Sequence, residues 1–309
     1  MPPNASNEPV SYAHDANASA HDASTLTAMA LLIKENCWKW DSEKGAYFVK
    51  YYNHQHVAEK VRMIHKRLTS IDFPYSIPLQ PNQDKQTIIQ PWHIATSANY
   101  DDRGDRLQAI LCLQALHETN EPINWEKEPL LPSYSLIEKW TVRLNRFIQH
   151  EAKLTALLGR DYEMIVNIAL LSLKEIRKLR PPAEKLTLLH GDIVHHNILL
   201  SQTDVPKLID FDLAALGHAS DEMILWLQRA LPNVGYQLKS LLNEHEYLSI
   251  TKPKLPYLLY PNEVMREALY VLRVEEEQRE PLCQFLLPFT KEALANWSRL
   301  QYAIQSVSV

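Results

Sequence analysis

Three polar side chains stand beside apolar runs in the middle of the chain, at a spacing that could do chemistry. Asn197 lies five positions after Asp192, and Asp210 follows thirteen positions after Asn197, across a segment that predicts a short hairpin. Phosphoryl transfer needs a carboxylate that orients the attacking hydroxyl and accepts its proton, and amide and carboxylate oxygens that hold Mg²⁺ on the nucleotide phosphates. The pattern therefore predicts Asp192 as the catalytic carboxylate, and Asn197 and Asp210 as metal ligands.

Each of these residues alone has an ordinary structural explanation. An Asp after a Gly is common in turns and helix caps, an Asn likewise, and Asp210 could simply end a strand. Such roles give no reason for the Asp–Asn spacing, followed by a second apolar strand that ends in Asp-Phe-Asp. The combination favours a catalytic loop. A zinc site at His190, His195 and His196 is disfavoured, because neighbouring residues of an extended loop point apart and no further ligand lies nearby.

The compound motif resembles that of one enzyme superfamily. His190–Asp192, Asn197 and Ile209–Phe211 are similar to the motifs of the aminoglycoside phosphotransferase and choline kinase superfamily of small-molecule kinases. Segments 73–78 and 131–146 look closest to its spore-coat kinase-like and homoserine kinase-like branches. The resemblance implies an α+β, two-lobed, protein-kinase-like fold, with a small antiparallel-sheet N-lobe and a larger, mainly helical C-lobe. It also implies transfer of the γ-phosphoryl group of ATP, with Mg²⁺, to a hydroxyl of a small molecule.

The predicted N-lobe contains a lysine on a strand and a glutamate on the following helix. Lys50 lies in the strand-like run 46–52, where a charged side chain on a half-buried element needs a partner. A helix is predicted from about His56 to Leu68, with Glu59 near its start. The resemblance makes Lys50 and Glu59 an ion pair in which the lysine holds the nucleotide phosphates. A first-turn glutamate also suits the helix dipole alone, which is the alternative for Glu59.

The nucleotide is expected to be held without a glycine-rich loop. The chain has 6 glycines and neither a Gly-x-Gly-x-x-Gly nor a P-loop motif. The run 87–92 is predicted to be the last N-lobe strand, leading into the hinge, with Pro91 ending regular pairing. Backbone groups around Gln90, Trp92 and His93 are then expected to meet the adenine edge.

The predicted C-lobe begins with a helix from about Asp105 to Glu118, whose His117 is expected to be structural. Residues 133–178 are predicted to be helical, and the resemblance implies that they form an insertion that helps to shape the acceptor pocket. Lys139, Arg143 and Arg146 recur there at helical spacing, a pattern that is usually solvated surface, with binding of an anionic acceptor as the alternative.

A later segment is expected to support the catalytic loop. Residues 217–223 predict a helix start, with Ser220 or Asp221 as its cap. The resemblance implies that Asp221 braces the loop by accepting its backbone N–H groups, and that His190 holds the loop as a structural residue. Asp212 is left without a role.

Composition bounds the class of protein. With 309 residues, 46% hydrophobic and 22% charged, the chain can bury a large core. We expect a disordered tail over residues 1–24, an N-lobe over 25–91 and a C-lobe over 92–309. The net charge of −5, with basic residues spread along the chain, argues against a nucleic-acid partner. No apolar run could span a bilayer and no secretory signal is recognisable, so neither a membrane partner nor export is expected.

The three cysteines, Cys37, Cys112 and Cys283, are an odd number spread far apart, and they indicate free thiols in a reducing compartment. A cytoplasmic location is therefore expected.

Two other functional classes remain open. A kinase-like structural or binding protein, for example of the spore-coat type, would keep the fold without turnover, although such a scaffold needs none of the phosphoryl-transfer groups. A protein kinase is disfavoured, because no Ala-Pro-Glu segment follows Asp210 and Gly191 replaces the arginine of the protein-kinase loop. The acceptor is expected to be a small molecule whose chemical class the motifs leave open.

Overall fold

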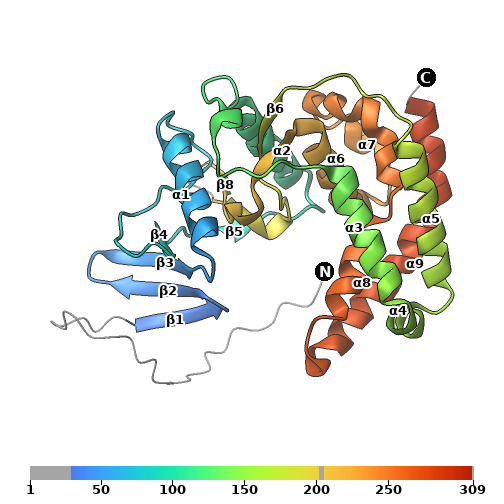
Figure 1. Ribbon diagram of the computed structural model, residues 1–309, viewed down its shortest axis with the longest axis horizontal. Coiled ribbons are helices and arrows are strands. Elements are labelled where there is room, and N and C mark those ends of the chain that lie inside the picture. The colour runs from blue at the N-terminus through green and yellow to red at the C-terminus, as the bar shows by residue number, and fades with distance from the viewer. Residues whose placement is uncertain (1–28, 202–204, 308–309) are drawn as a thin grey trace.

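The N-lobe is a four-stranded antiparallel sheet with one helix. The computed structural model describes residues 29–201 and 205–307, so the expected tail of residues 1–24 lies outside the described residues. In spatial order the strands are β1 (Met29–Lys34), β2 (Cys37–Ser42), β3 (Gly45–Tyr51) and β4 (Thr87–Pro91). Figure 1 shows this sheet at one end of the molecule, with the helical C-lobe at the other.

Helix α1 (Gln55–Thr69) joins the sheet to the rest of the molecule. Ala58 and Val61 on its inner side form a small core with Tyr52 and with Ile88 of β4. Further along the helix, Ile64 and Leu68 belong to the main core of the C-lobe. The apolar spacing that predicted this helix therefore serves two cores, and α1 links the two lobes.

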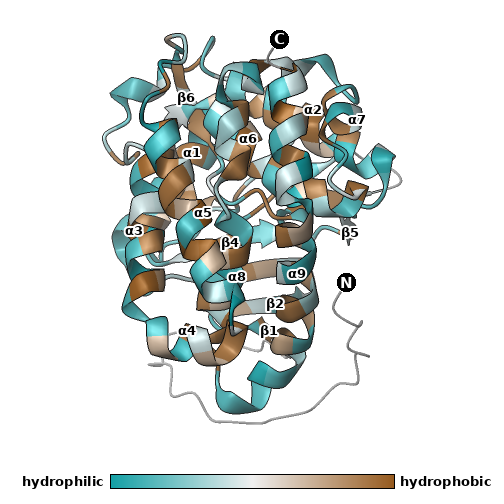
Figure 2. Cartoon of the chain, turned by 90° about the vertical axis from the view of Figure 1, so that its right-hand side faces the viewer, coloured by the Kyte–Doolittle hydropathy of each residue, from teal (hydrophilic) through white to brown (hydrophobic). Residues whose placement is uncertain are grey.

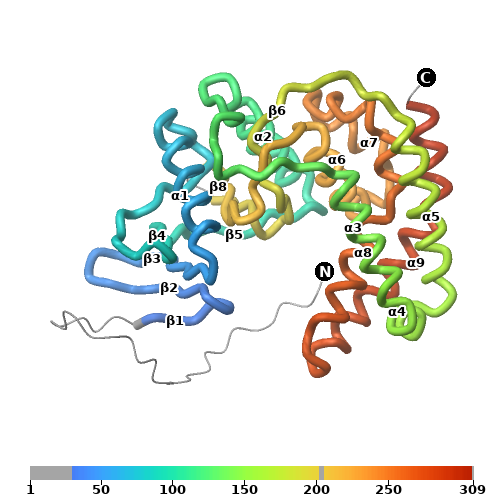
Figure 3. Tube along the Cα trace, viewed as in Figure 1, coloured from blue at the N-terminus to red at the C-terminus, as the bar shows by residue number. Residues whose placement is uncertain are grey.

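The C-lobe is built around helices that pack on one large apolar core. Its α-helices are α2 (Arg103–Glu118), α3 (Leu136–Gln149), α4 (Glu151–Leu158), α5 (Asp161–Ile176), α6 (Ala219–Ala230), α7 (Leu238–Leu242), α8 (Asn262–Val271) and α9 (Glu276–Val307). Short 3₁₀ helices are η1 (Trp125–Lys127), η2 (His195–Asn197), η3 (Phe211–Leu213), η4 (Leu231–Val234) and η5 (Glu246–Leu259). The long α9 lies alongside α5 and α8 (Figure 3).

Helix α6 lies at the centre of this core. All but two of its twelve residues are buried, and Trp226 is fully enclosed. Most of the helices have both hydrophilic and hydrophobic stretches, as Figure 2 shows by colour. Of the helices in the described ranges, none combines the length and apolar character needed to cross a membrane.

Two small sheets carry the polar segments singled out above. Strand β6 (Leu186–Leu189) pairs antiparallel with β9 (Ala215–His218). Strands β7 (Ile198–Leu200) and β8 (Lys207–Leu208) form the expected hairpin, and β5 (Thr96–Ser97) pairs with β7. Each acidic segment thus leaves the end of a buried strand, because β6 leads into residues 190–192 and β8 into residues 209–212.

His65 is a buried imidazole where α1 meets the C-lobe. Its side chain is enclosed, its ring meets the edge of Phe211 at 5.4 Å between centroids, and its Nδ1 has no hydrogen-bond partner in the chain as described. Burial lowers the pKa of His65 to about 4, and a hydrogen bond with the Ile77 backbone opposes this only in part. The folded chain therefore holds this histidine uncharged at neutral pH.

A His65→Met variant is expected to lose less stability in acid than the wild type. The folded histidine resists protonation, so its contribution to the free energy of unfolding is present above the unfolded-state pKa near 6.5 and is lost as the pH falls toward 4. Between about pH 7 and about pH 4.5, urea unfolding should show the wild type losing about 2 kcal/mol more than the variant. Equal losses in the two chains would contradict an uncharged imidazole at this position.

Candidate active site

The loop after β6 positions Asp192 through a backbone turn that requires glycine. Gly191 has φ of +81°, and a side chain there would overlap the carbonyl oxygen of Leu213. His190 Nε2 lies 2.8 Å from the carbonyl oxygen of Ile209, so the histidine ties this loop to the segment that precedes Asp210. This is the structural role expected of His190, while the side chain of Asp192 stays about one-third exposed.

A buried carboxylate braces the same loop, and it belongs to Glu222. Its two oxygens accept hydrogen bonds from the backbone N–H groups of His190, at 3.1 Å, and Gly191, at 2.7 Å. His117 Nε2 lies 2.8 Å from the same carboxylate, and Tyr247 contacts the other ring nitrogen of His117 at 2.7 Å. Burial opposes ionisation, but the hydrogen bonds and nearby charge of His117 outweigh it and lower the pKa of Glu222. The carboxylate is thus held in its charged form.

The expectation that Asp221 braces the loop was wrong by one residue. Asp221 instead pairs with Lys254, 2.7 Å away, and Ser220 donates its hydroxyl to Glu184. Neither residue caps α6, because the N-cap position is His218 and no side chain caps the helix there. Neighbouring residues of a helix point about 100° apart, so only the packing of α6 decides which of two adjacent carboxylates meets the loop.

Asn197 is held next to Asp192 by the backbone of the loop. Its side-chain Nδ2 donates to the backbone carbonyl oxygen of Asp192 at 2.9 Å. The backbone carbonyl oxygen of Asn197 accepts a hydrogen bond from the N–H of Ile209 at 3.0 Å. The residue is buried. With the amide nitrogen used in this way, the amide oxygen is the group that Asn197 can offer to a cation.

Asp210 and Asp212 lie on either side of the Lys50 ammonium group. The Lys50 Nζ is 2.8 Å from Asp210 and 2.6 Å from Asp212, and Tyr52 donates its hydroxyl to Asp212 at 2.7 Å. Asp210 has a left-handed backbone, with φ of +67°. Burial opposes ionisation of Asp210, but Lys50, with help from Lys34, lowers the pKa of this carboxyl to about 2. The two carboxylates thus already bind one positive charge, the ammonium group of Lys50.

The expected ion pair between Lys50 and Glu59 is not formed. Glu59 accepts a hydrogen bond from Gln55, one turn earlier on α1, at 2.6 Å. The α1 side chain that reaches the site is the next residue, Lys60, which donates to the carbonyl oxygens of Asp212 at 2.6 Å and Ala214 at 3.0 Å. The pairing prediction is therefore corrected, and a contact between Glu59 and nucleotide stays a prediction without support from this geometry.

The predicted hinge residues lie at the end of β4. Gln90 is buried and its Nε2 donates to the carbonyl oxygen of Ile77 at 2.9 Å. The backbone N–H of Trp92 donates to the carbonyl oxygen of Ala46 at 2.9 Å. This N–H is one of the backbone groups that were expected to meet adenine, and it is already hydrogen-bonded within the sheet. The Trp92 ring is partly exposed, with Lys39 Nζ 5.6 Å from its centroid. A role for Gln90 and Trp92 in nucleotide binding stays a prediction.

Sequence reasoning missed a residue that contacts the candidate catalytic carboxylate. Arg229, in the last turn of α6, places its NH2 3.1 Å from Asp192 Oδ1. Its side chain is only 11% exposed. The one signal in the sequence was a basic residue near the end of a helix whose central part is apolar, and that signal does not say which loop the helix faces.

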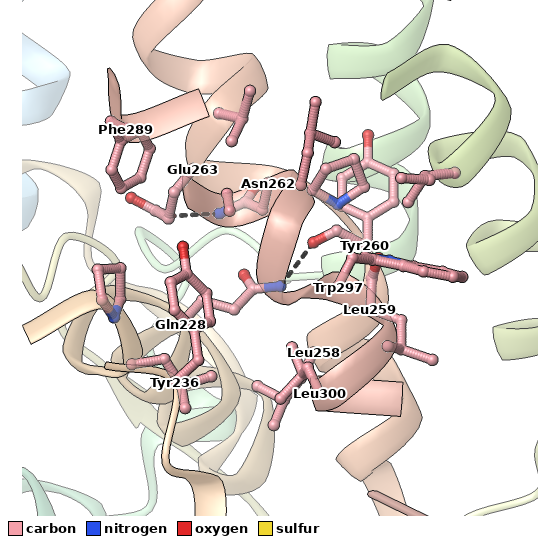
Figure 4. Close-up of a pocket in the computed structure, with 17 residues that line it drawn as sticks. Gln228, Tyr236, Leu258, Leu259, Tyr260, Asn262, Glu263, Phe289, Trp297 and Leu300 are labelled. Atoms are coloured by element: carbon pink, nitrogen blue, oxygen red, sulfur yellow. Dashed lines mark hydrogen bonds between the residues drawn. The ribbon is translucent and has the colours of Figure 1, made fainter. Parts of the chain in front are cut away.

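An apolar pocket elsewhere in the C-lobe is separate from these residues. Figure 4 shows it between η5, α8 and α9, where Gln228 Nε2 donates to the carbonyl oxygen of Tyr260 at 2.9 Å. None of the proposed catalytic, metal-binding or nucleotide-binding residues lines it. Glu263 is at its border, and this carboxylate also contacts Arg229.

Comparisons with known proteins agree with the resemblance found in the motifs. The model of the phosphotransferase enzyme family matches residues 84–233, a range that contains Asp192, Asn197 and Asp210. No curated protein sequence matches the chain.

Solved structures of similar fold include three phosphotransferases. An aminoglycoside phosphotransferase from Alicyclobacillus acidocaldarius is 15% identical, with a TM-score of 0.60 over 91% of this chain and 94% of that one. A spectinomycin phosphotransferase in complex with ADP and spectinomycin is 17% identical, with a TM-score of 0.59 over 90% and 93%. Choline kinase from Streptococcus pneumoniae is 11% identical, with a TM-score of 0.50 over 91% and 94%. The α+β, two-lobed, protein-kinase-like fold and the resemblance to this superfamily are thereby confirmed.

Replacing Glu222 by glutamine is expected to loosen the catalytic loop. The amide would present a donor where the loop also presents donors, so a buried hydrogen bond is lost, at a cost of about 2 to 4 kcal/mol. Hydrogen exchange at residues 190 and 191 should become faster. Asp221→Asn is the matched control, because it removes a neighbouring buried charge that contacts Lys254 and not the loop. Faster exchange at these two amides in Asp221→Asn, and not in Glu222→Gln, would contradict this assignment.

Proposed function

We propose that this chain transfers the γ-phosphoryl group of ATP, with Mg²⁺, to a hydroxyl group of a small molecule. The observation that carries the proposal is the convergence of Asp192, Asn197, Asp210 and Lys50 on one place. Asn197 bonds to the backbone of Asp192, and Lys50 reaches across from the N-lobe to Asp210. In phosphoryl transfer, positioning and charge neutralisation supply most of the catalysis, and these four groups supply both.

Asp210 and Asn197 are the residues that would hold Mg²⁺. The ammonium group of Lys50 between Asp210 and Asp212 supports this, because the two carboxylates already accept a positive charge at hydrogen-bonding distance. The lowered pKa of Asp210, caused by Lys50 and Lys34 against the effect of burial, keeps this carboxylate ionised at neutral pH. When bound, Mg²⁺ neutralises charge on the phosphate oxygens. Lys50 can then contact the α and β phosphates.

Asp192 is proposed to orient the acceptor hydroxyl and to accept its proton late in the transfer. Its side chain is about one-third exposed, and the backbone N–H groups of its loop are bound by the buried carboxylate of Glu222. Arg229 places its Nη2 3.1 Å from Asp192 Oδ1, so a cation stands beside this carboxylate. Loss of the carboxylate should therefore cost on the order of a hundredfold or more in rate.

The acceptor and the setting belong to the proposal as well. Two of the similar structures are a spectinomycin phosphotransferase and a choline kinase, and both names point to small molecules as acceptors. A small-molecule acceptor in the cytoplasm is proposed for this chain by analogy. A kinase-like structural protein is not favoured, because the matching family is one of phosphotransferases.

Two variants should separate the proposed roles of the carboxylates. Asp192→Asn is expected to leave the affinity for MgATP nearly intact while abolishing transfer, because its carboxylate acts on the acceptor. Asp210→Ala is expected to weaken Mg²⁺-dependent nucleotide binding itself, by about tenfold or more. Isothermal titration with MgATP measures both affinities. Equal loss of nucleotide affinity in the two variants would reject this division of roles.

Nucleotide should stabilise the chain, and more so with the metal. MgATP is expected to raise the melting temperature more than ATP with EDTA, because Asn197 and Asp210 gain their charge partner only with Mg²⁺ and binding to the folded state stabilises it. Slow ATP hydrolysis without acceptor should accompany this shift, with Asp192→Asn as the blank. If millimolar nucleotide leaves the melt unchanged and hydrolysis does not exceed the blank, the chain is not a phosphotransferase.

A further inference from the structure

Four basic side chains from three helices gather near Asp192. This basic cluster consists of Lys139 and Arg143 of α3, Arg229 of α6 and Arg266 of α8. Helix α8 packs against both α3 and α6, which brings the four side chains together. Arg229 contacts Asp192 at 3.1 Å, and its charge acts on Lys139 and on His195 of the catalytic loop. The basic cluster therefore borders the place where an acceptor hydroxyl would meet Asp192.

Among the described residues, two of these four cations, Arg229 and Arg266, form ion pairs with carboxylates, and Lys139 and Arg143 form none. Glu263 is shared, with its Oε2 2.9 Å from Arg266 and 3.5 Å from Arg229. Arg266 also contacts Glu267 at 2.6 Å, while Arg143 donates to the amide oxygen of Asn262. Two further carboxylates, of Asp192 and of the buried Glu222, act on Lys139, but Asp192 is proposed to act on the acceptor hydroxyl and Glu222 binds the backbone of the loop.

Several donors of the basic cluster lack a partner or have a weak one. In residues 29–201 and 205–307, Lys139 forms no ion pair, and its hydrogen bond to the Tyr134 hydroxyl is long, at 3.4 Å. Its ammonium lies 5.0 Å from the Tyr134 ring centroid. Nε and Nη1 of Arg229 and Nε of Arg266 are buried and have no hydrogen-bond partner among the described residues. A buried cationic donor without a partner is costly, so a cluster that served only to join α3, α6 and α8 would not be expected to leave these three.

The charges around Lys139 also favour a bound anion. Burial, followed by the nearby charges of Arg143 and Arg229, lowers the pKa of Lys139 to about 8. The carboxylates of Asp192 and Glu222 oppose this shift only in part. An anion placed among these groups would relieve that repulsion and would fill the free donors.

We propose that the basic cluster binds an oxyanion of the acceptor, a carboxylate or a phosphate group, and so holds the acceptor hydroxyl at Asp192. The inference rests on the proposed function, whose acceptor class it narrows. Guanidinium groups bind planar or tetrahedral oxyanions through paired hydrogen bonds, and a lysine adds a point charge. The same groups repel a polycation, so an acceptor with several amino groups, such as an aminoglycoside, is disfavoured.

Anion binding can be measured without any turnover. Inorganic phosphate and malonate are titrated by calorimetry into the full chain at fixed ionic strength, with saturating MgADP present to occupy the nucleotide site. The wild type should bind at least one of them, and a preference for malonate or for phosphate tells whether the acceptor group is a carboxylate or a phosphate. Lys139→Gln should weaken this binding about tenfold or more, because a charge-assisted hydrogen bond is lost.

Arg146→Gln is the matched control. Arg146 lies on the same helix and carries the same charge, but it is exposed and lies outside the basic cluster. The Arg146→Gln variant should change the anion affinity less than twofold, and MgADP should bind the wild type and both variants with equal affinity. If Lys139→Gln has no cooperative melt, Arg143→Gln takes its place, with the same expected weakening.

Two results would overturn the inference: a wild type that binds neither anion, or equal weakening in the variant and the control. Failure of the proposed function would look different, because MgADP would then not bind the wild type. The comparison of Lys139→Gln with Arg146→Gln would still decide the anion site in that case.

Discussion

The buried carboxylate of Glu222 is the contact on which the candidate site depends. A charged group this deep in a protein is costly unless every oxygen is satisfied. Here the backbone N–H groups of His190 and Gly191 and the ring of His117 supply the partners. The contact connects α2, α6 and the loop after β6, so two helices of the core fix the loop that carries Asp192. The turn at Gly191 is possible only because no side chain stands against Leu213.

A second set of charges joins the two lobes. Lys50 lies in β3, Tyr52 directly follows that strand and Lys60 lies in α1, and all three contact Asp212 or its neighbour Asp210. The N-lobe therefore meets the C-lobe through charged groups at the place proposed for nucleotide phosphates. Since these contacts are electrostatic, a bound phosphate and cation would compete with them directly. In this fold the same lysine can hold the lobes together and bind the nucleotide.

The charged groups near Asp192 differ from those around Lys50. The carboxylates of Asp210 and Asp212 flank Lys50 where the metal is proposed, whereas Arg229 contacts both Asp192 and Glu263 where the acceptor is proposed. A fold of this type offers a general phosphoryl-transfer loop, while the helices around it decide which acceptor is tolerated. Here those helices are α3, α6 and α8, which carry the basic cluster that is proposed to bind the acceptor.

The sequence by itself determined what depends on residues close together in the chain. The loop from His190 to Asn197, the β7–β8 hairpin, and the helices α1 and α2 follow from local spacing and apolar pattern, and the structure has them where they were expected. Tertiary packing alone decided which side of a helix meets the site. Lys60 and Glu222 contact the site, whereas their neighbours Glu59 and Asp221 were expected to do so. Lys139 and Arg143 were expected to be solvated surface, but they face the basic cluster. The physical reason is that a charged residue has the same local preference on either side of a helix, and only the groups on the neighbouring elements determine where its charge is stabilised.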